Sequence, residues 1–323
     1  MKVVVVGAGI AGLTSAVVLK EKGHQVEVFE KRSYVGGLCH DSFESGVLFQ
    51  YHGPHIFHTD DRRVRNFIKR YATLYPFHHV VWARTDIGMF PIPFCKKSAR
   101  IVGDLSPKRL TELVFKGYSQ KHWGLPWEDL PLSVRKRVPV KRESEDDRYT
   151  LDTYQGVPLG GYARMFEAMA EGLSVHLSVE SDCWRSQRAD LVVYTGRLDE
   201  YFHSEHGALG YRSARMIHRK EPPRKFAIVN ECMLEVPWTR STDHSHWTDN
   251  TDIEATLVTY EYPCGIYEAE PLYPVEFGSE ARFVRRYRKM ASKEKNTVFV
   301  GRMATHRYLD MHVVVKQAME AFG

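Results

Sequence analysis

The 323-residue sequence contains few cysteines and no long apolar run. Five cysteines without a C-x-x-C spacing exclude a disulfide framework and a thiolate zinc site, and they favour a reducing compartment. They are Cys39, Cys95, Cys183, Cys232 and Cys264. No apolar stretch approaches the roughly 18–20 residues that cross a bilayer. The chain enters a strand-like run at once, without a secretory signal, so we expect a cytoplasmic protein that does not bind membranes.

The sequence also lacks a large excess of one charge. Lys and Arg number 45 and Asp and Glu number 40, which gives a net charge of +5. These residues are spread along the chain rather than gathered in runs. The distribution argues against a nucleic-acid groove and fits sites for small anions.

The first 30 residues have the pattern of a strand–helix–strand unit. Residues 3–6 are four valines, as expected of a parallel strand that is buried on both faces. Residues 10–22 predict a helix that stops at Gly23, and residues 25–29 predict the next strand.

Later segments predict a second sheet and a helical insert. Residues 75–94 and 149–287 contain short strand-like runs between turns, which is typical of antiparallel sheet. Residues 106–117 predict a helix with Ser106 as its N-cap. Residues 129–141 predict a mobile loop, 297–300 a strand, and 310–322 a terminal helix.

We therefore predict an α/β fold in three parts. A Rossmann-like FAD-binding domain comprises residues 1–74, 190–205 and 295–323. An antiparallel β-sheet domain for the substrate comprises residues 75–94, 138–189 and 206–294. Residues 95–137 form a small helical insert and the mobile loop.

A glycine-rich loop follows the first predicted strand. Gly7, Gly9 and Gly12 match G-x-G-x-x-G between a strand and a helix, where the helix N-terminus faces a diphosphate. Glu30 ends the second strand, where a carboxylate accepts hydrogen bonds from a ribose. Glycines at 36 and 37 permit a second close approach to the phosphates, which favours FAD over NAD. The alternative is a glycine-rich turn without a ligand.

From these motifs onward, the sequence resembles the prokaryotic UDP-galactopyranose mutases over nearly its whole length. The resemblance rests on separate blocks in order: 51–59 (YHGPHIFHT), 115–124 (FKGYSQKHWG), 137–140 (RVPV), 147–149 (DRY), 154–156 (YQG), 209–213 (LGYRS), 237–240 (PWTR), 273–275 (YPV), 299–302 (FVGR) and 307–311 (RYLDM). It implies an isomerase that interconverts UDP-galactopyranose and UDP-galactofuranose without net redox change.

The resemblance also implies the chemistry. Reduced FAD attacks the anomeric carbon through N5 and displaces UDP, and the sugar ring opens through a flavin iminium and recloses. NAD(P)H or another donor supplies the electrons. The protein must hold the diphosphate, stack the base and support the flavin.

Three residues receive catalytic roles from the resemblance. Arg137 and Arg240 clamp the diphosphate, because guanidinium forks bind phosphate oxygens and stay charged. His58 is placed near the flavin N5. For Arg137 the alternative is a solvated basic loop, and for Arg240 it is a surface salt bridge.

The predicted binding residues form two sets. The cofactor set is Gly7, Gly9, Ile10, Gly12, Glu30, Lys31, Gly37, Leu38, His55, Ile56, Arg212, Gly301, Arg302, Leu309, Asp310 and Met311. The substrate set is His79, Phe115, Tyr118, Ser119, Trp123, Arg137, Tyr149, Asn230, Arg240, Tyr273 and Tyr308. The aromatic members could instead be packed in the core.

The sequence predicts no metal site. His52, His55 and His58 are three residues apart, but Gly53-Pro54 breaks any helix that would bring them to one face. No carboxylate or cysteine nearby completes a ligand set.

One departure from the family pattern concerns self-association. The segment between Phe94 and Phe115 is shorter than in typical relatives, and family dimers often use this insert. The case for a homodimer is therefore weaker. Two rival functions remain: a flavin oxidoreductase with an apolar substrate tunnel, and a catalytically silent nucleotide-sugar binder.

Overall fold

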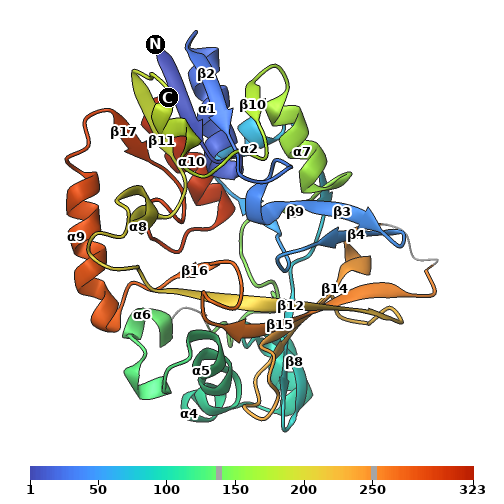
Figure 1. The fold of residues 1–323 in the computed structure, drawn as a ribbon. Helices are drawn as coiled ribbons and strands as arrows, with labels where there is room; N and C mark the ends of the chain where they lie inside the picture. Colours follow the sequence, from blue (N-terminus) through green and yellow to red (C-terminus); the bar gives the residue numbers. More distant parts are fainter. Residues whose placement is uncertain (136–139, 249–252) are drawn as a thin grey trace.

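A five-stranded parallel sheet lies beside both chain ends, at the top of Figure 1. The structure is a computed structural model that describes residues 1–135, 140–248 and 253–323. In sheet order the strands are β10 (Ser174–His176), β2 (Gln25–Phe29), β1 (Lys2–Val6), β11 (Leu191–Tyr194) and β17 (Thr297–Phe299). Val3, Val4 and Val5 in the central strand have no exposed surface, as the valine run predicts.

Helices from both ends of the chain pack together against this sheet. Helix α1 (Ile10–Glu21) contacts α10 (Met311–Phe322) and α7 (Gly161–Ala170). Helix α2 (Arg62–Ile68) packs on α10. The predicted strand–helix–strand unit and the Rossmann-like α/β fold are confirmed.

A seven-stranded sheet forms the second layer. In sheet order its strands are β16 (Tyr273–Pro274), β12 (Tyr211–Glu221), β15 (Thr256–Cys264), β14 (Arg240–Asp243), β13 (Ile228–Glu231), β7 (Val81–Thr85) and β8 (Gly88–Ile92). All neighbouring strands are antiparallel except β13 and β7, which are parallel. The predicted antiparallel sheet is therefore present, with one parallel pair.

Two small sheets connect the layers. Strand β3 (Asp41–Glu44) pairs with β4 (Val47–Gln50), and β9 (Tyr154–Pro158) lies between β5 (Phe57–Thr59) and β6 (Leu74–Pro76). One apolar core continues from Val5 through Phe57 to Phe90 in the larger sheet and to Trp247 beside it. The two layers consequently share a core, which fixes the loops between them.

The helical insert lies within the predicted bounds 95–137 and contains more helical segments than the one predicted over residues 106–117. Its segments are α3 (Lys96–Val102), α4 (Pro107–Leu110), a π-helical turn η2 (Thr111–Lys116), α5 (Gly117–Trp123), η3 (Trp127–Asp129) and α6 (Leu132–Arg135). Ser106 is the N-cap, as predicted, and its Oγ accepts the Arg109 N–H at 3.2 Å. The predicted helix end at Gly117 is wrong. A Cβ at Gly117 would lie 2.2 Å from the Cys232 carbonyl oxygen, so this glycine serves close packing rather than termination.

Three further expectations are corrected. Residues 149–287 also contain the helix α7, the first part of α9 (Ala281–Ala291) and the parallel strands β10 and β11. The parallel strands were missed because a short strand gives no sign of its partner's direction. The assignment of 138–189 to the antiparallel domain is wrong for β10, which pairs with β2 in the parallel sheet, and α7 packs on α1. The other domain boundaries stay predictions. The predicted loop 129–141 begins with η3 and the helical turn α6, and residues 136–139 lie outside the described residues. The remaining helical segments are α8 (Leu198–Tyr201), α9 (Ala281–Ala291), η1 (Gly37–Cys39), η4 (Cys183–Ser186), η5 (His244–Trp247) and η6 (Gly278–Glu280).

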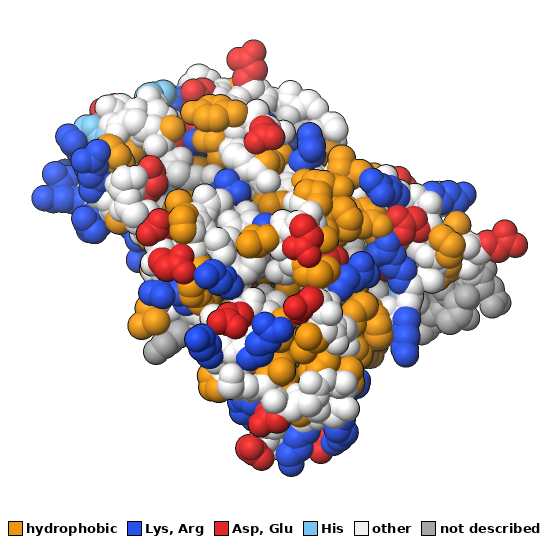
Figure 2. All heavy atoms as spheres, turned by 90° about the horizontal axis from the view of Figure 1, so that it is seen from below, with side chains coloured by type: hydrophobic (Ala, Val, Ile, Leu, Met, Phe, Trp, Pro, Cys, Tyr) orange, Lys and Arg blue, Asp and Glu red, His pale blue; other side chains and the backbone are white. Residues whose placement is uncertain are grey.

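The surface seen from below mixes charges of both signs, with apolar side chains between them (Figure 2). Within the described ranges, no helix has both the length and the apolar character needed to cross a bilayer.

Candidate active site

A cavity of about 860 Å³ lies between the two layers. It reaches Gly7 after β1 and Glu30 after β2, and it continues to Asn230 on β13 and Arg240 on β14. Its volume is typical of small-molecule pockets, and the carboxyl ends of parallel strands are where α/β proteins bind ligands.

Most predicted site residues line this cavity. From the cofactor set they are Gly7, Gly9, Ile10, Glu30, Lys31, Gly37, Leu38, His55, Ile56, Gly301, Arg302, Leu309, Asp310 and Met311. From the substrate set they are His79, Phe115, Tyr118, Ser119, Trp123, Tyr149, Asn230, Arg240, Tyr273 and Tyr308, together with His58. Gly12 and Arg212 do not line it, and Arg137 lies outside the described residues.

Two glycines of the first loop are required by the fold itself. A Cβ at Gly7 (φ +99°) would lie 2.3 Å from Thr195 Oγ1. A Cβ at Gly12 would lie 1.8 Å from the Gly7 carbonyl oxygen, because α1 packs closely on β1. Gly12 therefore supports the loop from behind rather than facing the cavity.

Gly9 is different, because the protein leaves room for a side chain there. Its φ of −80° suits any residue, and an added Cβ would meet only ordinary contacts at 3.9 Å from the Gly37 Cα. Gly37 itself has φ +57°. The two glycine backbones thus form a cradle that a side chain would fill, at the N-terminus of α1. Such a cradle fits a diphosphate.

Glu30 is buried and held by main-chain donors. Its Oε2 accepts the Ala8 N–H at 2.8 Å, and its Oε1 accepts the Arg32 N–H at 2.9 Å. The Arg32 guanidinium also pairs with Glu270, and both residues line the cavity. Sequence reasoning missed Arg32 and Glu270, which are 238 residues apart. Lys31 has a side chain that is 57% exposed and lies at the cavity rim.

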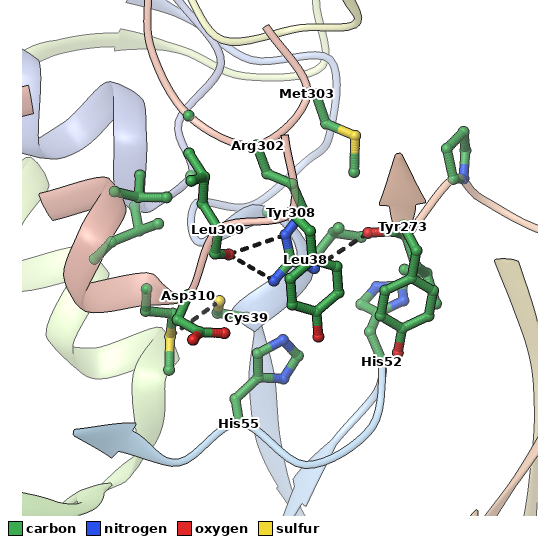
Figure 3. A pocket seen from close by; sticks show the side chains of 18 of the residues that line it. Leu38, Cys39, His52, His55, Tyr273, Arg302, Met303, Tyr308, Leu309 and Asp310 are labelled. Atoms are coloured by element: carbon green, nitrogen blue, oxygen red, sulfur yellow. Dashed lines mark hydrogen bonds between the residues drawn. The ribbon is translucent and has the colours of Figure 1, made fainter. Parts of the chain in front are cut away.

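Arg302 is fixed in the cavity wall by main-chain carbonyls (Figure 3). Its Nε and one terminal nitrogen donate to the Leu309 oxygen at 3.1 and 2.8 Å, and the other donates to the Leu272 oxygen at 3.1 Å. The guanidinium lies 4.6 Å from the Tyr308 ring centroid. An anchored cation of this kind supports negative charge on a group in the cavity.

His55 is a neutral imidazole in the same wall. Burial lowers its pKa to about 3, and Arg302 adds to the effect. Its Nδ1 lies 2.9 Å from the Gly53 carbonyl oxygen, so Nδ1 carries the proton and Nε2 is an acceptor. In Figure 3 the rings of His55 and Tyr308 point toward one another.

Arg240 is the centre of a polar cluster at the opposite end of the cavity. It donates to Tyr118 Oη at 3.0 Å and to Asn230 Oδ1 at 3.4 Å. Its guanidinium lies 3.6 Å from Glu261 Oε1, across the β14–β15 pair. Although burial opposes the charge, Glu261 holds the pKa of Arg240 well above its ordinary value. Burial raises the pKa of Glu261, and Arg240 opposes that rise.

Aromatic rings line the space beside Arg240. The Tyr273 and Tyr308 rings are stacked with centroids 5.7 Å apart, and His122 lies 4.6 Å from Tyr273. Phe115 and Trp123 also pack against protein, with Phe115 on the main core and Trp123 on Phe277. Phe115 and Trp123 therefore line the cavity and also pack against other apolar side chains, which was the alternative to a binding role.

His79 lines the cavity and has a side-chain nitrogen without a partner among the described residues. Burial lowers its pKa to about 3, so the ring is neutral. Its Nδ1 is buried without a hydrogen-bond partner among the described residues. The Tyr149 ring lies 5.3 Å away, and its N–H donates to the His79 carbonyl oxygen at 2.7 Å. An unsatisfied nitrogen in this position fits a polar ligand.

The fold brings a carboxylate and a further histidine, both distant in the sequence, next to one of the three histidines. His58 lies with Asp152 and His312, and their ligand atoms are within 4.8 Å of one another. However, His58 Nδ1 lies 2.5 Å from Asp152 Oδ2. That is a hydrogen-bond distance, whereas two zinc ligands lie roughly 3 Å or more apart. The geometry therefore describes a histidine oriented by a carboxylate.

Arg212, a residue of the predicted cofactor set, is held by main-chain carbonyls of α5. Its Nε donates to the His122 carbonyl oxygen at 3.0 Å, and a terminal nitrogen donates to that of Lys121 at 3.3 Å. Arg212 therefore fixes the end of α5, next to Gly124, and does not line the cavity.

Known proteins of similar sequence share this organisation. The family model for UDP-galactopyranose mutase matches residues 113–308, and the model for the NAD(P)-binding Rossmann-like domain matches residues 5–71. A probable UDP-galactopyranose mutase of Klebsiella pneumoniae is 31% identical over 98% of this chain and 93% of its own. A dTDP-fucopyranose mutase of Escherichia coli is 28% identical over 99% and 97%.

The fold comparison agrees. A crystal structure of reduced UDP-galactopyranose mutase superposes with a TM-score of 0.81 and 15% identity, covering 99% of this chain and 93% of that one. With the family model over more than half of the chain and the Klebsiella relative over nearly all of it, this chain belongs to the UDP-galactopyranose mutase family of isomerases.

Proposed function

We propose that this protein interconverts UDP-galactopyranose and UDP-galactofuranose with FAD as its cofactor. The observation that carries the proposal is one continuous cavity that joins the Gly9–Gly37 cradle to the buried cluster around Arg240. A cradle for one diphosphate and a fixed cation for another are what a flavin and a nucleotide sugar require together.

The residues at the cradle fit FAD. Gly9 and Gly37 would admit its diphosphate, and Glu30 would accept hydrogen bonds from its ribose. Arg302, Leu309 and Asp310 would lie beside the ring system, where Arg302 favours extra electron density. When bound and reduced, FAD would supply an electron-rich nucleophile for the sugar, with NAD(P)H or another donor as reductant.

Arg240 would hold the leaving diphosphate. Its charge is fixed at any working pH, and Tyr118 and Asn230 orient the guanidinium through hydrogen bonds. Arg137 would supply the second cation. Tyr273 and Tyr308 lie where their rings can border the phosphates or the sugar.

The base and the sugar would occupy the rest of the cavity. Phe115, Tyr118, Ser119 and Trp123 come from η2 and α5 and would contact the uridine, since aromatic faces stack on bases. His79, with its unused Nδ1, and Tyr149 would contact the sugar or its phosphates.

His58 would act beside the reacting atoms. Because Asp152 accepts at Nδ1, that nitrogen carries the proton and Nε2 is left to accept one. His58 could thus hold a proton during ring opening and return it on closure.

The rival oxidoreductase function is disfavoured by the cavity wall. Such an oxidoreductase takes a hydride from an apolar or amine substrate, which it would bind in an apolar tunnel. Here the second half of the cavity is built from Arg240, Asn230 and tyrosines instead. The other rival function, a catalytically silent nucleotide-sugar binder, is tested by measuring whether the reduced protein converts a nucleotide sugar.

The decisive experiment is incubation of dithionite-reduced holoprotein with UDP-galactofuranose, with the ring size of the product read by chromatography. We expect UDP-galactopyranose from the reduced protein and none from the oxidised protein. A parallel reaction with dTDP-fucofuranose tests the activity named for the Escherichia coli relative. Equal turnover by oxidised protein, or no turnover of either sugar, would overturn the proposal.

Two further expectations accompany this function. All five cysteines are unpaired, which supports a reducing compartment such as the cytoplasm. Because the insert is short, we expect a monomer or a dimer formed through another surface, and light scattering will distinguish them.

A further inference from the structure

Lys121 on α5 extends into a loop of the seven-stranded sheet. Its Nζ lies within 2.8–2.9 Å of four main-chain oxygens, one at the end of β13 and three in the connection from β13 to β14. This carbonyl cage consists of the oxygens of Glu231, Met233, Val236 and Trp238. An ammonium group has three N–H donors, so it cannot donate a separate hydrogen bond to each of four oxygens. The arrangement therefore resembles the coordination of a free cation more than a set of individual hydrogen bonds.

The cage is closed by close packing. At Gly117, one turn before Lys121, α5 approaches the Cys232 carbonyl so closely that a Cβ would lie 2.2 Å from it. The Glu231 carboxylate is 1% exposed, and its charge favours the ammonium. Burial lowers the pKa of Lys121 to about 8, so the group is still charged at neutral pH.

The caged loop joins two strands that carry site residues. Asn230 lies on β13 just before the loop, and Arg240 begins β14 just after it. Tyr118 lies one turn before Lys121 on α5, and its hydroxyl accepts from Arg240 at 3.0 Å. One ammonium therefore fixes the position of α5 relative to both strands.

We propose that Lys121 is a built-in monovalent cation whose carbonyl cage locks α5 onto the β13–β14 loop and so holds Tyr118 against Arg240. Lys121 is a positioning residue, because it does not line the cavity and acts through Arg240. The consequence for nucleotide affinity rests on the proposed role of Arg240 in binding the diphosphate. Rings of carbonyls replace the hydration shell of monovalent cations, so the cage itself should accept a free ammonium ion when the side chain is shortened.

The test compares Lys121→Ala, Lys121→Met and the exposed control Lys108→Ala in FAD-loaded protein. Isothermal titration with UDP measures the site without turnover. We expect Lys121→Ala to weaken UDP binding by about tenfold to a hundredfold while the bound FAD is unchanged, since an uncaged loop lets Arg240 move. Lys108→Ala should bind UDP like the unmodified protein.

Chemical rescue separates a cation cage from simple packing. Ammonium or methylammonium chloride should restore UDP affinity and thermal stability to Lys121→Ala, and tetramethylammonium chloride at equal ionic strength should not. Lys121→Met fills the space with an uncharged chain and should not respond to either salt. If Lys121→Ala folds only in ammonium, that dependence supports the cage.

Two results would overturn the proposal: UDP affinity in Lys121→Ala equal to the control, or identical responses to ammonium and tetramethylammonium. Failure of the unmodified protein to bind UDP would refute the proposed function instead. The ammonium dependence of thermal stability would still report on the cage in that case.

Discussion

Replacing Arg240 with alanine should reduce both the folding stability and the UDP affinity of the protein. A second substitution, Glu261→Gln, should restore the stability but not the affinity. The Arg240 side chain is 24% exposed and that of Glu261 is 4% exposed, and they lie 3.6 Å apart. Removing the guanidinium leaves a buried carboxylate without its counter-charge. Breaking a buried ion pair in this way costs about 3–5 kcal/mol, and the partial exposure of Arg240 places the expected loss near 3 kcal/mol.

The double variant Arg240→Ala/Glu261→Gln should recover most of that stability. With the carboxylate gone, no buried charge remains unpaired, and removing both partners of such a pair is often nearly neutral. Nucleotide affinity should not recover. Lost charge-assisted hydrogen bonds are worth about 1.5–3 kcal/mol, which corresponds to roughly 10- to 150-fold weaker UDP binding.

Urea unfolding of the FAD-loaded proteins and titration with UDP measure the two effects separately, with Glu261→Gln as the matched control. The reasoning also predicts a pH effect in Arg240→Ala. Because burial raises the pKa of Glu261 above its ordinary 4.5, the unpaired carboxylate should cost less as acidification protonates it. A double variant that binds UDP normally, or that is as unstable as Arg240→Ala, would refute the assignment.

Three further predictions address the cofactor loop, a buried histidine and the His58 pair. Gly9→Ala should keep its folded stability but lose FAD affinity by tenfold or more, whereas Gly12→Ala should destabilise the apoprotein as well. Flavin titration measures the FAD affinity of each variant, and thermal melts measure the stability of its apoprotein. If Gly9→Ala bound FAD as tightly as the unmodified protein, that result would contradict the cradle. His244 has a pKa of about 3 in the folded protein and an ordinary value of 6.5, so stability should rise with pH between these values by about 1 kcal/mol per unit. Urea unfolding at pH 7 and pH 5 should show a smaller difference for His244→Gln, and an unchanged difference would disprove the link. Asp152→Asn should lower the turnover of the reduced protein and shift the pH profile of that turnover, with little change in UDP affinity. The reason is that His58 loses the acceptor that fixes its tautomer. An unchanged pH profile would count against the role of Asp152 in orienting His58.

Much of the parallel layer could be predicted because its signals are local. The valine run, the spaced glycines and Glu30 lie within 30 residues, and each has a physical meaning that does not depend on distant contacts. The fold class followed from this unit. Family motifs extended the prediction to cavity residues on other elements, such as Tyr118 on α5 and Arg302 after β17.

The errors and omissions share a different origin. Arg212 belongs to a family motif, yet its guanidinium donates to main-chain carbonyls at the end of α5 and does not line the cavity. Strand β10 pairs with β2 of the parallel sheet, and a three-residue strand does not encode that choice of partner. Gly117 is a residue type that often ends helices, but here it permits close packing on the carbonyl of Cys232, which is distant in the sequence.

The sequence by itself determined the nucleotide-binding unit, since spacing along one strand and helix specifies it, and its family motifs indicated the family and most of the residues that line the cavity. Only the tertiary structure decided which charges meet. Asp152 reaches His58 across 94 residues, and Lys121 finds the Trp238 carbonyl across 117. Main-chain carbonyls and buried partners leave no pattern in residue order, because their positions depend on how the two layers pack.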